Sequence, residues 1–293
     1  MMTKVTVLLL IFLAAIWGSS FIFMRASVES FGPVGLIALR IIVAALCMFV
    51  FLLKRRRFLE FVKHWRILLI VGLLNSAIPF LFLAYASLNL TGGTVSILNA
   101  MTPVFTAWIT HIWLHDKMTK LQFFGMFLSI TGLVFLAWDK VSLNLASWLP
   151  ILSGVSAAIS YGIATNLAKR YLADVSIMTS TSGSLFFSGI FMSLLLIPFM
   201  PDVHNIPSIQ WIYGIALGSL CTALAYIIYF NLIKSIGPMK TASVTFLIPI
   251  FSFIWGYLLL GERVTLRMWI ATAIILCGMC LVMGLIKKRS PKL

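Results

Sequence analysis

Acidic side chains are scarce in this chain of 293 residues, where seven Asp and Glu stand against 22 Lys and Arg. All seven acids lie at the ends of apolar runs or between them, so no carboxylate is placed at mid-membrane to bind a cation or carry a proton. Charged residues of both signs make up only 10% of the chain, against about 25% in soluble domains. This shortage excludes an ordinary soluble domain.

Catalytic and metal-binding patterns are also missing. The four cysteines lie in apolar runs, and the C-x-x-C pair Cys277 and Cys280 lacks polar neighbours, so we expect packing rather than redox chemistry. His111 and His115 share one helical face but find no third metal ligand beyond Asp116. No G-x-x-x-x-G-K-[ST] loop for a nucleotide occurs. We therefore predict no catalytic residue, no metal and no cofactor, and that the protein is not an enzyme.

Long apolar runs dominate what is present. Hydrophobic residues make up 61% of the chain, and the mean hydropathy is +1.09. About 20 apolar residues cross a hydrocarbon core as a helix. The sequence thus predicts an all-α integral membrane protein with ten transmembrane helices, at 5–24, 33–53, 67–87, 93–115, 120–138, 148–167, 177–199, 208–230, 238–260 and 267–286.

Positive charge sets the predicted orientation. The net charge of +15 could suggest nucleic acid, but Lys and Arg gather in short loops, as expected for a membrane protein. With both termini in the cytoplasm, 17 of the 22 basic residues face that side. We predict a multi-pass protein of the inner (plasma) membrane with both termini cytoplasmic and no nucleic-acid partner. Loop 54–66 is expected to be a short amphipathic helix, which either anchors the chain or binds anionic lipid.

One sequence motif, the duplicated phrase, occurs twice in the chain. Residues 102–116 read TPVFTAWITHIWLHD, and residues 248–262 read IPIFSFIWGYLLLGE, an offset of 146. Trp17–Gly18 likewise matches Tyr161–Gly162 at an offset of 144. The duplication predicts two repeats, 1–140 and 145–293, with five spans each. Because five is odd, the second repeat is inverted relative to the first, an architecture common in secondary transporters.

The duplicated spans carry small and polar stripes at helical spacing. Those stripes are Ser96, Asn99, Pro103, Thr106 and Thr110 in the first copy, and Ala242, Thr245, Pro249, Ser252 and Gly256 in the second. Lipid offers such faces no hydrogen-bond partners, so we expect both to face inward, either lining a cavity or packing helices closely. The prolines are predicted hinges or gates, with Pro79 as a third. Asp116 and Glu262 are expected to cap the next helix.

The order of these motifs resembles a known family. The resemblance rests on three features: AAIWGSSFIFMR at 14–25, Pro33 and Arg40 of the second span, and the duplicated phrase. On these residues the chain is similar to the drug/metabolite transporter superfamily, and within it to amino-acid and metabolite exporters with two EamA-like repeats. The first copy departs from the family's usual Gly-Glu by ending in His-Asp. The resemblance implies a ten-helix bundle around a central cavity and transport by alternating access. It does not indicate which substrate this chain carries.

Candidate substrate-binding residues are neutral polar groups, aromatics and one arginine. Arg40 lies within the second span, where it either binds a substrate carboxylate or satisfies helix carbonyls and snorkels outward. Aromatic faces accept flat substrates and cations, and they also serve ordinary packing. The predicted set is Trp17, Arg40, Asn75, Tyr85, Asn99, Trp108, Tyr161, Asn166, Tyr226, Tyr229 and Thr245.

The sequence thus favours a secondary transporter that exports a small organic metabolite, an amino acid or a related zwitterion or amine. Quaternary amines and nucleobases are alternative substrates, and an integral-membrane enzyme is the alternative class. Coupling to a proton gradient or to exchange stays open. The expected partners are a small-molecule substrate and membrane lipid, with the protein a monomer or homodimer.

Overall fold

The computed structural model describes residues 3–138 and 148–285, and every regular element in these two stretches is helical. The predicted boundary between the halves, at residues 140–145, and the basic residues beyond 285 lie outside the described residues.

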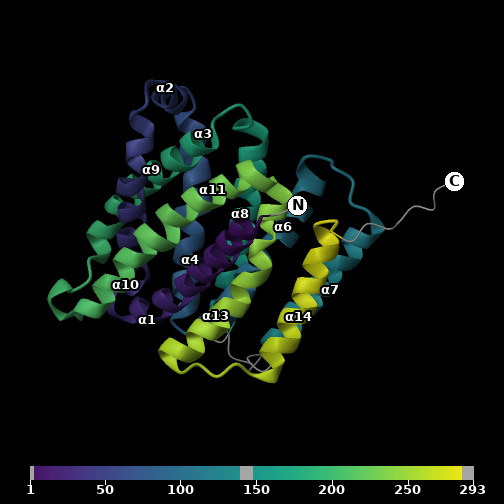
Figure 1. Ribbon diagram of the computed structural model, residues 1–293. Helices are drawn as coiled ribbons and strands as arrows, with labels where there is room; N and C mark the ends of the chain where they lie inside the picture. The colour runs from purple at the N-terminus through teal and green to yellow at the C-terminus, as the bar shows by residue number, and fades with distance from the viewer. Residues whose placement is uncertain (1–2, 139–147, 286–293) are drawn as a thin grey trace.

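Ten crossings are present in the described residues. Eight helical stretches are long and apolar enough to span a membrane. The first of them, Lys4–Leu53, contains α1 (Lys4–Phe49), which bends at Gly32 (φ 66°, ψ 161°) and so makes two crossings. The second arm of α1 leads to α2 at the top of Figure 1. The shorter apolar helix α14 (Leu266–Val282) adds the tenth crossing. The predicted all-helical membrane fold is confirmed.

The remaining helices follow in chain order. The first half continues with α2 (Arg55–Lys63), α3 (Trp65–Gly72), α4 (Ile78–Ser87), α5 (Gly92–Asn99), α6 (Thr102–Trp113) and α7 (Lys120–Ala137). The second half contains α8 (Leu149–Tyr171), α9 (Ile177–Leu196), α10 (Ser208–Gly218), α11 (Ala225–Ile236), α12 (Pro238–Ala242), α13 (Val244–Leu260) and α14.

Several predicted spans differ from the observed helices. No loop separates the first two crossings, because helix continues beyond residue 24 up to the bend at Gly32. The fourth crossing is two helices, α5 and α6, that meet at Ala100 and Met101. The ninth divides at Ser243, between α12 and α13. By contrast, the short helix expected within 54–66 is present as α2.

Two crossings contain a π-helical segment in their middle. Leu73–Ala77 joins α3 to α4, and Ser219–Leu224 joins α10 to α11. The first residues of the two segments are 146 positions apart, the same offset as the duplicated phrase. π-Helical turns are rare and concentrate at functional sites. These matched segments therefore direct attention to the middle of the bundle.

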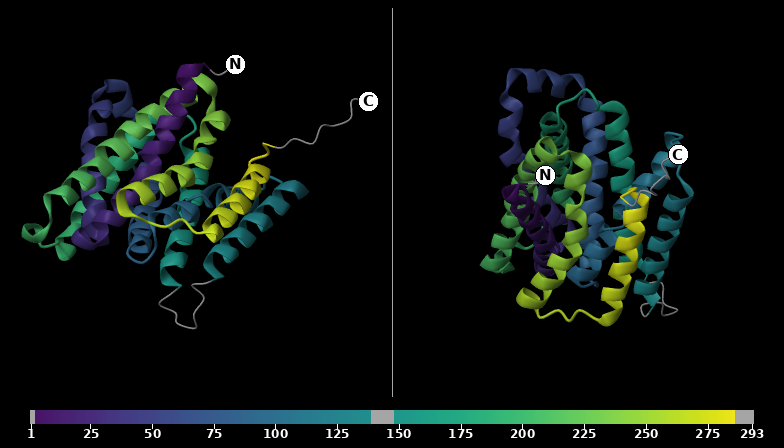
Figure 2. Two further views of the ribbon diagram at one scale, coloured as in Figure 1. Left: turned by 60° about the horizontal axis from the view of Figure 1, so that its bottom comes forward. Right: turned by 45° about the vertical axis from the view of Figure 1, so that its right-hand side comes forward.

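The arms of α1 form the centre of the bundle, where they pack on α9, α10 and α13. Helices α7 and α14 pack chiefly on one another and stand to one side in every view (Figures 1 and 2). Their contact is close because Gly125 faces Gly278, with Ser129 donating to the Ile275 carbonyl at 3.3 Å. The cavity between the two halves is therefore formed by the other eight crossings.

Candidate functional site

A cavity of about 400 Å³ lies between the two halves of the bundle. Side chains from both halves line it, and eight of the eleven predicted binding residues are among them. These eight are Trp17, Arg40, Asn75, Asn99, Tyr161, Tyr226, Tyr229 and Thr245. The inverted halves thus bring together residues up to 228 positions apart in the chain.

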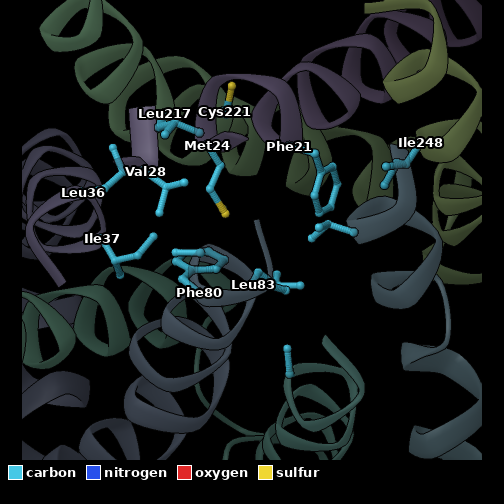
Figure 3. Close-up of a cluster of buried hydrophobic side chains, with 14 of the residues drawn as sticks. Phe21, Met24, Val28, Leu36, Ile37, Phe80, Leu83, Leu217, Cys221 and Ile248 are labelled. Carbon is cyan, nitrogen blue, oxygen red and sulfur yellow. The ribbon is translucent and has the colours of Figure 1, made fainter. Parts of the chain in front are cut away.

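One end of the cavity is closed by apolar side chains. Phe21, Met24 and Leu83 line it there and are 5%, 0% and 1% exposed. Figure 3 shows Met24 and Phe80 pointing toward one another, with Leu83 beside them. Toward the other end, Thr165 lines the same cavity and is exposed. The cavity therefore opens at the end of the bundle where α8 finishes and α9 begins.

A hydrogen bond between the two halves of the bundle stabilises the closed end of the cavity. The Glu262 carboxylate accepts from the Gly92 N–H at 3.0 Å, at the start of α5. Gly256 provides the room, because a Cβ there would lie 2.8 Å from Glu262 Oε2. The prediction that Glu262 caps the following helix is wrong: Thr265 caps α14, and Glu262 caps a helix of the other half.

Aromatic rings form two groups around the cavity. Trp17 lies against Tyr229 with ring centroids 5.3 Å apart, and the Tyr226 and Phe230 rings stack at 5.8 Å. On the other side the Phe80 ring meets Tyr161 edge-on at 6.4 Å. Rings of both groups line the cavity and can pack against a flat or cationic group.

Arg40 provides the positive charge of the cavity wall. Its side chain comes from the second arm of α1, and the residue is 5% exposed. The guanidinium carbon lies 3.7 Å from the Phe80 ring centroid, and Nε donates to Thr222 Oγ1 at 3.1 Å. Within residues 3–138 and 148–285, no carboxylate lies within ion-pair distance of it. A buried cation without a protein counter-ion fits a ligand that brings a negative charge.

The π-helical segments place polar groups beside Arg40. Asn75 lies in the first segment, and Cys221 and Thr222 lie in the second. Sequence reasoning missed Cys221 and Thr222, although Cys221 matches Asn75 at the duplication offset. Thr165, Thr181 and Phe80 also line the cavity and were not predicted. The offset of 146 could have found Cys221, which matches Asn75, and Phe80, which matches Tyr226; the other residues required the fold.

The repeated aromatic–glycine pair has a structural explanation. A Cβ on Gly18 would lie 2.9 Å from the Ser252 backbone nitrogen, and one on Gly162 would lie 3.1 Å from that of Thr106. Each glycine therefore lets a first-span helix cross closely over the duplicated span of the other half. The aromatic residue before each glycine, Trp17 or Tyr161, lines the cavity.

Three predicted residues do not line the cavity. Tyr85 and Trp108 are 39% and 43% exposed on the outside of the bundle, where membrane lipid would meet them. Asn166 is buried in a helix contact: Thr110 Oγ1 donates to its Oδ1 at 2.7 Å, and its Nδ2 donates to the Thr106 carbonyl at 3.1 Å. In each stripe the residues that come first in the sequence, such as Asn99 and Thr245, line the cavity. Later residues pack helices: Thr106 lies against Gly162, and Ser252 lies against Gly18.

The three predicted hinge prolines occupy different settings. Pro103 is the second residue of α6, next to the break in the fourth crossing, and lines the cavity. Pro249 lies inside the continuous helix α13, so the break of the ninth crossing is at Ser243 instead. Pro79 is the second residue of α4, directly after the π-helical segment. Because the backbone hydrogen bonding is already irregular at this junction, the N–H that proline lacks is not required there.

Comparison with known proteins agrees with this architecture. The model of the EamA-like transporter family matches residues 4–138 and again residues 148–284. The chain belongs to this family. Among proteins of similar sequence, the transporter YoaV of Bacillus subtilis is 26% identical over 90% of this chain and 91% of its own. YedA of Escherichia coli K12, an inner membrane transporter, is 24% identical over 91% and 87%.

The EamA family and these relatives are transporters rather than enzymes. PagO of Salmonella typhimurium is also similar, with 23% identity over 87% of each chain. A solved crystal structure covers 95% of this chain and 97% of its own, with a TM-score of 0.64 and 17% identity, which supports the fold. The chain is therefore a multi-pass membrane transporter of the EamA family, within the drug/metabolite transporter superfamily.

Proposed function

We propose that this EamA-family transporter exports a small zwitterion that carries a carboxylate, an amino acid or a close relative, by alternating access. The observation that carries the proposal is Arg40, a buried guanidinium in the cavity wall that lacks a carboxylate partner among the described residues. A charge-assisted pair with a substrate carboxylate would be strong, because Arg40 is largely shielded from solvent. Asn75, Asn99 and Thr245 offer neutral groups for the remainder of the substrate.

The open end of the cavity supports export as the proposed direction of transport. Basic loops lie at that end, and the positive-inside rule places them in the cytoplasm of the cell. The described conformation would then take up its substrate from the cytoplasm and release it after the closed end opens. Fusing a fluorescent protein or alkaline phosphatase to the C-terminus tests the orientation, since only the former is active in the cytoplasm.

A cationic substrate such as a quaternary amine is the second candidate, because the aromatic residues Trp17, Tyr226 and Tyr229 line the cavity. Arg40 argues against it, since a like charge in a low-dielectric cavity is repelled. A nucleobase would satisfy the rings and leave Arg40 without a counter-ion. The substrate panel must therefore contain all three classes.

The test is flux into proteoliposomes that contain the purified full chain. A panel of amino acids, their decarboxylated amines, quaternary amines and nucleobases is measured with and without a proton gradient and with counter-substrate inside. We expect amino acids to be carried and the matched decarboxylated amines to be carried at least about tenfold more slowly, as loss of one charged hydrogen bond of about 1.5–3 kcal/mol implies.

Arg40→Gln should lower amino-acid flux by about tenfold or more, and Arg40→Lys should lower it less because the charge remains. Arg25→Gln is the matched control, since Arg25 pairs with Glu29 at 2.7 Å outside the cavity. Equal flux of an amino acid and its amine, or wild-type flux in Arg40→Gln, would overturn the role given to Arg40. Product formation without net flux would favour the enzyme class.

A further inference from the structure

Helix α2 lies between the second and third crossings, outside the cavity, and no residue in it is buried. It forms the arch at the top of Figure 1 and of the right-hand view of Figure 2. The substrate cavity leaves its residues unused. Its sequence, RRRFLEFVK, holds three arginines and a lysine among four apolar residues.

One face of α2 is fixed against α9. Glu60 Oε2 accepts hydrogen bonds from Thr179 Oγ1 at 2.8 Å and from the Ser176 N–H at 3.2 Å. Burial alone would raise the pKa of Glu60, but these hydrogen bonds and nearby Arg56 outweigh it and hold that pKa below its usual value. The Phe61 ring stacks on Phe187 with centroids 5.3 Å apart. These contacts fix the rotation of α2 about its own axis.

The opposite face is left apolar and exposed. Phe58, Leu59 and Val62 are 52%, 61% and 50% exposed, and at their spacing they share one side of the helix. A membrane protein has its surface in contact with either lipid or water. An exposed apolar side of this kind, directly beside charged residues, is typical of a helix lying in the membrane interface.

Cations flank the apolar side. Arg55, Arg56 and Lys63 are exposed and border an open hollow of about 650 Å³ that Leu59 also lines. His64 completes the basic part of the wall. The acids of the hollow are Glu60, which Thr179 and Ser176 already engage and which lies 3.6 Å from Arg56, and Asp174. The basic groups outnumber these acids, so the hollow is complementary to an anion.

We propose that α2 is an interfacial helix that binds anionic phospholipid. Phe58, Leu59 and Val62 insert among acyl chains, and Arg55, Arg56 and Lys63 hold the phosphate headgroup. A soluble phosphate would use the cations but leave the apolar side uncovered, which is why a lipid is the occupant. Because α2 joins the second and third crossings, the bound lipid would contact the segment that leads from Arg40 to Asn75.

Lipid binding to the purified full chain, measured by native mass spectrometry, tests the proposal. Phosphatidylglycerol and phosphatidylcholine are titrated in parallel, with glycerol phosphate as the soluble competitor. The variant R55Q/R56Q/K63Q is compared with K120Q/K234Q/K240Q, which removes the same charge from exposed positions outside α2. We expect the first variant to bind phosphatidylglycerol about tenfold or more weakly and the second to bind it as the wild type does.

A second variant, L59S/V62S, keeps every charge and removes the apolar side. We expect it to weaken phosphatidylglycerol binding, and glycerol phosphate to displace the lipid poorly from the wild type. Unfolding temperatures in phosphatidylcholine establish that each variant is folded. Wild-type phosphatidylglycerol binding by R55Q/R56Q/K63Q, an equal loss in the control, or efficient displacement by glycerol phosphate would each overturn the proposal.

Discussion

The two copies of the duplicated phrase end in the same backbone geometry but give their carboxylates different partners. His115 and Gly261, 146 positions apart, both have a positive φ, of 52° and 64°. After them, Asp116 is 68% exposed and lies 4.0 Å from Lys169, whereas Glu262 accepts a hydrogen bond from the Gly92 N–H of the other half. One end of the bundle is thus fastened by a bond that the other end lacks.

A single residue accounts for much of this difference. The position that matches Gly92 at an offset of 146 is Pro238, whose nitrogen carries no hydrogen. Asp116 therefore cannot repeat the capping bond of Glu262. The comparison teaches that a duplicated fold can hold one end closed and leave the other open through small local differences, while the shared framework stays the same.

The largest effect is expected where the two halves are alike, at the close helix crossings. Gly18→Ala and Gly162→Ala should each lower the free energy of unfolding by about 2–3 kcal/mol, because the new methyl meets backbone of the crossing helix. Gly189→Ala is the control, since its Cβ would meet only Ala45 at 3.3 Å. Unfolding in lipid micelles measures the three variants. A stable Gly18→Ala would contradict the packing role of the repeated motif.

The next effect separates the two ends. Glu262→Ala should lower the free energy of unfolding by about 1.5 kcal/mol, since a charged hydrogen bond to the first turn of α5 is lost. Asp116→Ala should change it by less than about 0.5 kcal/mol, because an exposed ion pair contributes little. With the four native cysteines replaced, a cysteine at Met24 should become reactive to an impermeant maleimide added at the closed end in Glu262→Ala and stay protected in Asp116→Ala. Equal stability and equal labelling of the two variants would contradict the proposed difference between the two ends of the bundle.

The smallest effect tests the matched positive-φ positions. His115→Gly should raise the free energy of unfolding by about 0.5–1 kcal/mol, because glycine adopts a left-handed conformation without steric cost. Gly261→Ala should lower it by a similar amount. Thermal unfolding of both variants beside the wild type gives the two signs, and two changes of the same sign would refute the match.

The inverted architecture could be predicted because its signals are local in sequence. Apolar runs gave the crossings, and the odd number of spans per repeat gave the inversion. Trp17 and Tyr161, which precede the matched glycines Gly18 and Gly162, line the cavity, because the neighbouring glycine brings each one to a close crossing.

The remainder of the site depended on features that a regular helical period cannot describe. Tyr85 lies beyond a π-helical segment, so counting at the α-helical period does not give its direction, and it faces outward. Asn166 lies at the right depth, but Thr106 and Thr110 take up its hydrogen-bonding groups. Nothing in the amide side chain distinguishes a packing role from a binding role until its neighbours are known.

The π-helical segments also make these two crossings longer in sequence than the distance they cover. Each holds one residue more per turn than an ordinary helix, so the side chains beyond it are rotated by about 100° from the regular series. Deleting one residue from Leu73–Ala77 would bring α4 back into phase with α3. Phe80 would then turn away from Arg40, and the cavity wall would lose the ring on which the guanidinium rests.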